Sequence, residues 1–167
     1  KIPTLKPAFR EGGTVTAANS SSISDGAAAL LLMRQSEAQR RGLQPLAIFH
    51  AHAGFADEPG LFPTAPIGAI QRLLGKTGWA LDDVDLFEIN EAFAVVPMVA
   101  MSELDIPHEK VNVNGGACAL GHPIGASGAR IIVTLLAALR RRQLKRGVAA
   151  ICIGGGEATA VAVELIY

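Results

Sequence analysis

Three short stretches of the sequence combine residue types that can carry out chemistry. They read Asn90-Glu91-Ala92-Phe93-Ala94, Gly121-His122-Pro123 and Cys152-Ile153-Gly154-Gly155-Gly156. A histidine offers a base near neutral pH, and a thiol can exchange protons with a substrate. Exposed N–H groups in a run of glycines can stabilise an oxyanion. The residue types together predict acyl transfer or enolate chemistry.

Each stretch taken alone also has a structural interpretation. Asn90 lies between a predicted strand and a predicted helix, where it can serve as a helix N-cap. His122 precedes a proline, which favours an extended conformation, so it can simply belong to a turn. Cys118 is expected to behave as a small buried hydrophobe. Cys152 differs because it ends a predicted central strand, and ligands of α/β sheets bind at the carboxyl ends of strands.

Hydrophobic periodicity and turn residues predict the elements that must position these stretches. Helix 131–139 is apolar on nearly every face and is predicted to be buried, and the serines and aspartate of 20–25 are typical of a helix N-terminus. Strands alternating with helices predict an α/β layered domain whose mixed sheet has about five strands flanked by helices. Strands are expected at 13–18, 45–53, 85–89, 148–153 and 158–166, and helices at 26–33, 36–41, 66–74, 92–104 and 131–139.

Length and charge limit the kinds of partner. The 167 residues suit one domain, and the 15 basic and 15 acidic side chains leave no net charge. Such a balance argues against nucleic acid and membrane surfaces as partners, and no apolar run is long enough to span a bilayer. The basic cluster Arg140–Arg146 follows a predicted helix, where the helix dipole favours cations. His50 and His52 are expected to share a strand face but to be structural, so no metal site is predicted.

Cysteine usage bears on the compartment. Two cysteines are too few for a disulfide framework, so we expect a reducing compartment and a cytoplasmic protein. An organellar location stays open, because the chain opens on Lys1-Ile2-Pro3 without a methionine and any targeting segment would precede it.

The ordered set of motifs resembles the C-terminal half of the thiolase family, the acetyl-CoA acetyltransferases and 3-ketoacyl-CoA thiolases. The key positions Asn90, His122 and Cys152 are separated by 32 and 30 residues (122 − 90 and 152 − 122). The matching stretches span most of the chain, so the resemblance implies that residues 1–167 form a C-terminal thiolase domain. They are GGTVTAANSSSISDGAAALLLM (12–33), DDVDLFEINEAFA (82–94), VNVNGGACALGHPIGASGAR (111–130) and CIGGGEATAVAVEL (152–165).

The resemblance implies a catalytic role for four residues. His122 activates a nucleophilic cysteine of the N-terminal half, and Cys152 takes a proton from the acetyl-CoA methyl group in condensation or returns one in thiolysis. Asn90 holds a water that, with His122, stabilises the enolate oxygen, and the Gly154 N–H belongs to a second oxyanion hole. A thiol that acts as a base needs an electropositive setting, which we expect the strand end to provide.

The resemblance also implies a coenzyme A tunnel. Ser21 is expected to touch the pantetheine arm, and Phe9, Ala17 and Phe93 to line the same tunnel. The alternative interpretation is that Phe9 and Phe93 are aromatic residues of the hydrophobic core. Coenzyme A thioesters would be substrates, and no cofactor is expected.

No cysteine precedes Cys118, so the resemblance implies that the nucleophile lies in an N-terminal half outside this sequence. Covalent catalysis needs that nucleophile within reach of its base, so this chain is expected to be inactive alone. The expected partners are acyl-CoA or coenzyme A, the N-terminal half, and a second copy in a homodimer or homotetramer. The alternative is a non-catalytic coenzyme A-binding or interaction module with the same fold. A relative of the ketoacyl-ACP synthases ranks lower, because those enzymes use histidine where this chain has Asn90 and Cys152.

Overall fold

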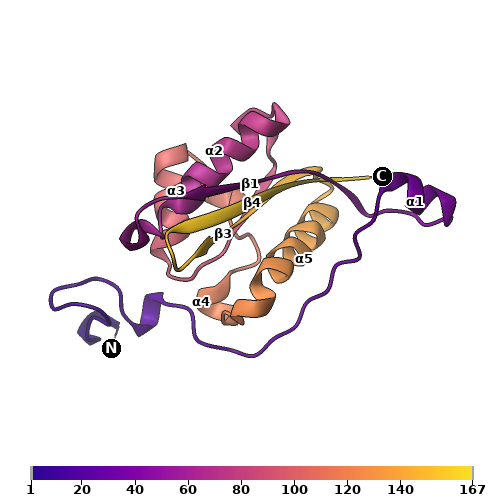
Figure 1. Cartoon of the computed structure of the whole chain (residues 1–167). Helices are drawn as coiled ribbons and strands as arrows, with labels where there is room; N and C mark the ends of the chain where they lie inside the picture. Colours follow the sequence, from indigo (N-terminus) through magenta and orange to yellow (C-terminus); the bar gives the residue numbers. More distant parts are fainter. Residues whose placement is uncertain (1, 167) are drawn as a thin grey trace.

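The computed structural model describes residues 2–166 and contains a mixed four-stranded sheet (Figure 1). Across the sheet the order is β1 (Ala47–Ala56), β4 (Glu157–Leu165), β3 (Arg146–Ile153) and β2 (Leu86–Ile89). β1 and β3 both run antiparallel to β4, whereas β2 and β3 are parallel. The predicted α/β class is therefore confirmed, and four of the five expected strands form within about three residues of their expected ends.

Helices cover the two faces of this sheet. α2 (Ala65–Thr77) and α3 (Val95–Leu104) lie on one face, and α5 (Ile124–Arg142) lies on the other, preceded by the short α4 (Ala117–Leu120) (Figure 1). Each face has its own apolar cluster. α2 ends at Gly78, whose φ of 71° is a left-handed conformation that glycine adopts without strain. The sheet is thus held between two helical layers.

α5 packs through one side only. Ile131, Leu135 and Leu139 repeat every four residues and are almost fully buried against the sheet. Burial of each such side chain contributes about 1.5–3 kcal/mol. Val133 on the other side is 42% exposed, so the prediction of a helix buried on nearly every face is wrong for this side. The apolar excess that prompted it forms a free surface in this structure.

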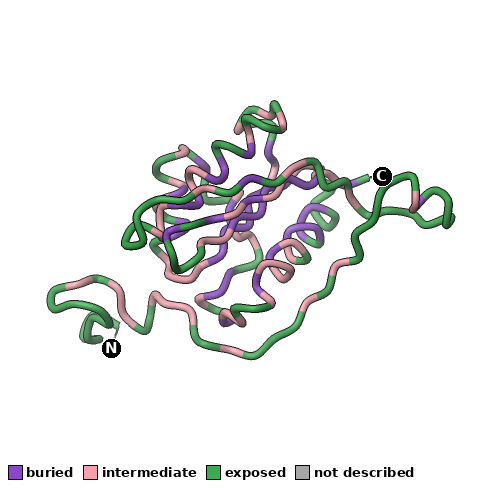
Figure 2. The backbone as a smooth tube through the Cα atoms, viewed as in Figure 1, coloured by how far each residue is buried: buried purple, intermediate pink, exposed green. Residues whose placement is uncertain are grey.

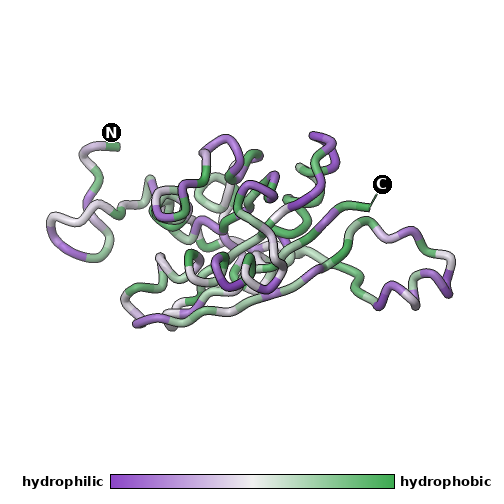
Figure 3. The backbone as a smooth tube through the Cα atoms, turned by 90° about the horizontal axis from the view of Figure 1, so that it is seen from above, coloured by the Kyte–Doolittle hydropathy of each residue, from purple (hydrophilic) through white to green (hydrophobic). Residues whose placement is uncertain are grey.

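The N-terminal strap, residues 5–33, departs most from expectation. It contains only a 3₁₀ turn at Ala17–Asn19 and runs in extended form past α4 and α5 toward α1 (Gln35–Arg40), so the predicted strand 13–18 and helix 26–33 are wrong (Figure 1). Figure 2 shows it mostly exposed, and Leu31 is 84% exposed. An eight-residue helix is marginal without tertiary packing, and most of residues 26–33 are exposed, although Leu30 packs against the apolar cluster on the α5 face. The stretch around α1 projects beside the C-terminus and is largely hydrophilic (Figure 3).

A bulge in β1 separates the two histidines of that strand. The pairing with β4 skips His50, whose ring instead meets Trp79 edge-on with centroids 5.1 Å apart. His50 Nε2 lies 2.9 Å from Glu164, whereas His52 pairs across from Val161. A bulge shifts the alternation of faces, so the expectation that the two imidazoles share a face is wrong.

Shorter 3₁₀ turns connect these elements, at Ile2–Thr4, Pro59–Leu61, Leu81–Asp83 and His108–Lys110. Within residues 2–166, none of the helices combines the length and apolar character needed to cross a membrane. The same described range holds no group of three or more His, Cys, Asp or Glu side chains placed to bind a metal ion.

Candidate active site

The parallel strand pair brings two of the three motifs to one edge of the sheet. β2 ends at Ile89, and the N–H of the next residue, Asn90, donates to the carbonyl of Ala150 in β3 with the atoms 2.9 Å apart. Two residues further along β3 stands Cys152. The carboxyl ends of strands in α/β sheets are where ligands bind. Asn90 follows the end of one such strand, and Cys152 lies at the end of its neighbour.

The third motif reaches Asn90 from the start of α5. His122 lies just before this helix, and its Nε2 is 3.4 Å from Asn90 Nδ2. On the other side of the ring, Nδ1 lies 2.6 Å from the hydroxyl of Ser127. Asn90 is 99% buried, so its amide is held in place. The structure therefore brings Asn90 and His122 together, and their joint action stays a prediction.

Ser127 determines the protonation pattern of the imidazole. Its hydroxyl donates to the carbonyl of Pro123, 3.0 Å away, so it can only accept from His122 Nδ1. Nδ1 therefore carries the proton, and Nε2 presents a lone pair. Partial burial lowers the pKa of His122, and the nearby Arg130 cation lowers it further. The neutral ring with a free Nε2 is the form that acts as a general base.

Cys152 does not join this hydrogen-bonded group. Among the described residues, no hydrogen bond links its thiol to Asn90 or His122, and it packs against the apolar cluster on the α2 and α3 face. Burial raises the pKa of the Cys152 thiol, with its own backbone pulling weakly the other way. The expected electropositive setting is thus not what this structure provides, and the protonated thiol dominates at neutral pH.

Gly154 begins the turn between β3 and β4. The residue is exposed, and a side chain at this position would meet nothing within 4 Å, so the backbone is open to approach. Gly156 in the same turn is buried with φ of 104°, a value that disfavours other residues. Gly156 is therefore needed for the hairpin itself, whereas the backbone of Gly154 is open to a ligand.

Glu91 fastens the loop that delivers His122. Its carboxylate accepts from the side chain of Asn112, 2.8 Å away, and from the N–H of Cys118, 3.0 Å away. Gly116 lies so close to the Glu91 carboxylate that an added Cβ would clash with it. Burial beside this carboxylate raises the pKa of Cys118 to about 11, which keeps the thiol protonated as the hydrophobe interpretation predicts.

Asn112 imitates a strand partner for the end of β2. Its side chain accepts from the N–H of Ile89 and donates to the carbonyl of the same residue, both at 2.8 Å. Its φ of 47° is left-handed, a conformation that asparagine tolerates better than most residues. The sequence motifs assigned no role to Asn112 or Ser127, and they included Glu91 only as the neighbour of Asn90. Only Ser127 had a readable signal, a hydroxyl in the first turn of the helix that follows the Gly121-His122-Pro123 motif.

The strap passes directly over the site. Ser21 donates twice to the carbonyl of Ala92, from its N–H at 3.1 Å and from its hydroxyl at 2.9 Å. The N–H of His122 donates to the carbonyl of Ser22 at 2.9 Å. The strap thereby ties the loop after β2 to the loop before α5. The Ser21 hydroxyl proton is taken, so this group remains only an acceptor for a ligand.

The aromatic residues assigned to the tunnel lie together. Phe9 meets Phe93 edge-on with ring centroids 5.5 Å apart, and Phe62 lies 6.2 Å from Phe93 on centroids. Phe9 is 73% exposed, so the alternative of a core aromatic is wrong for it, whereas Phe93 is half-buried against the core. Ala17 is exposed in the 3₁₀ turn of the strap.

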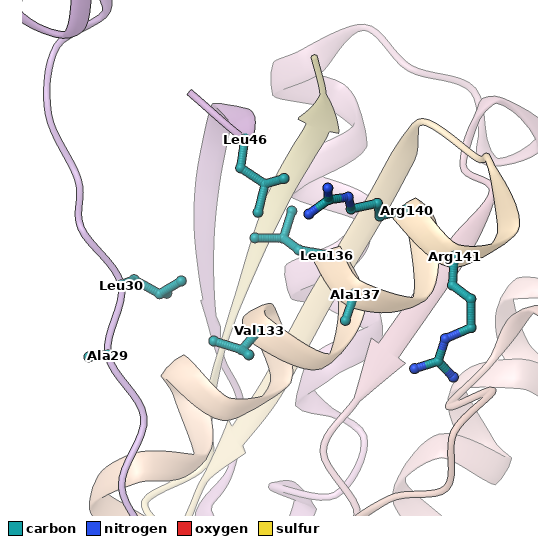
Figure 4. A pocket seen from close by; sticks show the side chains of 8 residues that line it. All are labelled: Ala29, Leu30, Leu46, Val133, Leu136, Ala137, Arg140 and Arg141. Atoms are coloured by element: carbon teal, nitrogen blue, oxygen red, sulfur yellow. The ribbon is translucent and has the colours of Figure 1, made fainter. Parts of the chain in front are cut away.

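A separate cavity of about 650 Å³ lies beside the later turns of α5 (Figure 4). Leu30 of the strap and Leu46 face Val133 and Leu136 of the helix across it. The α5 residues that line this cavity begin at Val133, nine residues after the helix starts at Ile124, and the lining is mainly apolar. The cavity is therefore separate from the Asn90 and His122 site.

Family models account for almost the whole chain. Residues 43–165 match the model described as thiolase, C-terminal domain, and residues 1–36 match the model described as thiolase, N-terminal domain. The chain therefore belongs to the thiolase family, as the motifs indicated.

Individual relatives agree with this assignment. The chain is 56% identical over 164 residues to a probable acetyl-CoA acetyltransferase of Dictyostelium discoideum, covering 98% of this chain and 40% of that protein. It is 54% identical to the cytosolic acetyl-CoA acetyltransferase of Mus musculus, and the match covers 96% of this chain and 41% of that protein. The chain thus spans about two fifths of the length of these curated relatives.

Solved structures share the fold. The acetyl-CoA acetyltransferase of Bacillus anthracis superposes with a TM-score of 0.96 at 47% identity, over 99% of this chain and 42% of that one. The Acat5 thiolase of Ascaris suum, solved in complex with coenzyme A, has a TM-score of 0.89 at 43% identity. That match covers 98% of this chain and 43% of the Ascaris chain. The layered arrangement of residues 2–166 is therefore that of a thiolase.

Proposed function

We propose that residues 1–167 form the C-terminal part of a thiolase that condenses two acyl-CoA molecules or cleaves a 3-ketoacyl-CoA with coenzyme A. The observation that carries the proposal is the contact between Asn90 and His122 at the sheet edge that also holds Cys152. The names of the relatives support the acyltransferase activity. Because this chain spans two fifths of their length, the activity belongs to a longer polypeptide.

His122 acts first in this scheme. Its unprotonated Nε2 takes the proton of a nucleophilic cysteine supplied from outside residues 1–167, and the thiolate sulfur attacks the acyl carbonyl carbon and expels the coenzyme A thiolate or the enolate. The proton left on Nε2 is then available to an oxyanion. Ser127 keeps Nδ1 protonated throughout, so the ring moves its proton at one atom only.

Cys152 handles the second proton. In condensation the Cys152 thiol first gives its proton to the expelled coenzyme A thiolate. The thiolate formed on Cys152 then takes a proton from the methyl carbon of acetyl-CoA, and the electron pair left behind moves onto the thioester oxygen. Asn90, through a water, and His122 stabilise that enolate oxygen, and the enolate carbon then attacks the acylated nucleophile. In thiolysis the Cys152 thiol returns its proton to the departing enolate carbon, a role that suits its raised pKa. Gly154 offers its N–H to the oxyanion beside the nucleophile.

Ser21, Phe9, Ala17 and Phe93 are proposed to hold coenzyme A. All four belong to the strap or to the loop that the strap crosses. An exposed phenylalanine edge and a serine that can only accept suit an arm that carries amide N–H groups and methylenes. We propose no cofactor besides the coenzyme A thioesters. We also propose a cytoplasmic location, with an organellar location as the alternative.

The remaining polypeptide and further copies of it are the proposed protein partners. Exposed apolar side chains on the strap, α4 and α5 support this, because monomeric surfaces seldom present such patches. We propose that an N-terminal half covers them and that the complete enzyme is a homodimer or homotetramer. The exposed residues are Ile23, Leu31, Leu32, Leu120, Ile124 and Val133.

The test uses the longer polypeptide with this chain at its C-terminal end. Coenzyme A-dependent loss of acetoacetyl-CoA should fall at least about a hundredfold in Cys152→Ser, because proton transfer at carbon loses its carrier. Cys118→Ser is the matched control and should retain activity. Equal activity of Cys152→Ser and the unaltered protein would refute the proposal. Coenzyme A binding without turnover would instead support the non-catalytic module.

A further inference from the structure

A buried ion pair stands behind the Asn90 and His122 contact. Arg130 Nη1 of α5 lies 2.9 Å from Glu88 Oε1 of β2. Glu88 is 2% exposed, and the Arg130 side chain is 18% exposed. Two charges this far from water cost free energy unless they are well paired, so the pair suggests a purpose beyond stability. Both residues lie within the longer stretches that resemble the thiolase family, but neither belongs to the three short motifs to which a chemical role was assigned.

The guanidinium also reaches the amide of Asn90. Arg130 Nη2 lies 3.5 Å from Asn90 Oδ1, on the side of the amide away from His122. A guanidinium only donates, and an asparagine amide has one accepting and one donating end. Turning the amide over would place two donors against each other at Arg130 and put an oxygen beside the Nε2 lone pair of His122.

We propose that Arg130, anchored by Glu88, is a positioning residue that fixes the Asn90 amide with Nδ2 toward His122 Nε2. It acts through Asn90 and does not touch substrate. The consequence for catalysis rests on the proposed function, since the oriented Nδ2 is the donor that holds the enolate-stabilising water. The orienting contact itself does not depend on that function.

Glu88 explains why the cation is arginine and why it stays in place. The planar fork sends one nitrogen to Glu88 and another to Asn90, a geometry that a lysine ammonium does not match. Glu88 and Asn90 are two residues apart, so both point toward α5 from the same side of the sheet. Arg130 lies in the first half of that helix and contacts both.

The first readout is independent of turnover. In the ¹⁵N-labelled 167-residue chain, the side-chain amide pair of Asn90, assigned by its loss in Asn90→Ala, should be protected from hydrogen exchange. Arg130→Met should reduce that protection at least about tenfold, because the amide loses its fixed acceptor contact. Arg142→Met, an exposed arginine on the same helix, is the control. Unchanged Asn90 amide signals in Arg130→Met would overturn the proposal.

Arg130→Met leaves the buried Glu88 carboxylate without its partner, so this variant can fail to fold. A second variant keeps the proposal testable in that case. Glu88→Gln combined with Arg130→Met removes both charges and should still release the Asn90 amide. Arg130→Lys keeps the charge but should restore only part of the protection. Full protection in the double variant would contradict the proposal.

Kinetics of the longer polypeptide test the link to catalysis. Arg130→Met should lower kcat about tenfold or more while KM changes less than about twofold, and in an Asn90→Ala background it should cost nothing further. An equal loss in both backgrounds would show that Arg130 does not act through Asn90. If the unaltered protein shows no turnover, the proposed function fails, and the amide measurement still decides the positioning role.

Discussion

The main-chain N–H of His122 donates a hydrogen bond to the carbonyl oxygen of Ser22, with the two atoms 2.9 Å apart. This bond joins a segment that matches the N-terminal family model to a loop that matches the C-terminal one. Together with the two bonds from Ser21 to Ala92, it makes the strap part of the wall of the site. The position of the imidazole therefore depends on both segments.

Replacing Ser21 should loosen the strap. Ser21→Ala removes the 2.9 Å bond from the hydroxyl to Ala92, and we expect a loss of about 1 kcal/mol in the free energy of unfolding, measured by urea denaturation. Ser22→Ala is the matched control, because its hydroxyl contacts only the exposed hydroxyl of Ser24 and its carbonyl is kept. Equal destabilisation by both changes would contradict the assigned role of the Ser21 hydroxyl.

Glu91 should be the main fastener of the loop before α5. Glu91→Gln exchanges one accepting oxygen for a donor that faces either Asn112 or the N–H of Cys118. Losing a charge-assisted bond and facing two donors should cost about 1.5–3 kcal/mol. The comparison is Glu103→Gln, a change of an exposed residue of α3, which should be neutral in the same urea titration. A Glu91→Gln chain as stable as the Glu103→Gln chain would contradict this account.

The sequence was sufficient to predict the regular core and the order of the motifs. Strong periodicity predicted α2, and an almost continuous apolar run predicted β3, since each is stabilised by contacts that its own residues specify. The alternation of strands and helices then brought Asn90 and the loop of His122 to one edge. Local pattern and tertiary packing agree in these elements.

The strap and the supporting residues of the site were beyond sequence reasoning. Residues 26–33 have high helix propensity, yet most of them are exposed in this structure, so little packing offsets the cost of forming so short a helix. Asn112 and Glu91 act through bonds to residues 21 to 27 positions away, which no local pattern reveals. The bulge at His50 likewise depends on the pairing with β4 and not on the residues of β1 alone.

The pH dependence of stability should report Glu88. Burial raises the pKa of Glu88 to about 7, against the opposing pull of Arg130. The folded chain then binds more protons than the unfolded chain between about pH 4.5 and 7, so this residue's contribution to stability is present below that range and lost as the pH rises through it. His122, with its lowered pKa, acts in the opposite direction below its ordinary value.

Glu88→Gln separates these two effects. The free energy of unfolding of the unaltered chain, relative to Glu88→Gln, should fall as the pH rises from about 4.5 to 7 and then level off. Glu109→Gln, an exposed carboxylate of the 3₁₀ turn His108–Lys110, should show no such trend. A difference between unaltered and Glu88→Gln chains that stays constant over this range would show that burial does not perturb Glu88.

The central claim is that this part of the protein forms and stabilises an enolate. The most direct measurement is the exchange of acetyl-CoA methyl protons for deuterium in D₂O, followed by NMR with the longer polypeptide, because it requires no carbon–carbon bond. We predict exchange with the unaltered protein, a loss of at least about a hundredfold in Cys152→Ser and in Asn90→Ala, and an unchanged rate in Cys118→Ser. Exchange at the unaltered rate in Cys152→Ser would contradict the account.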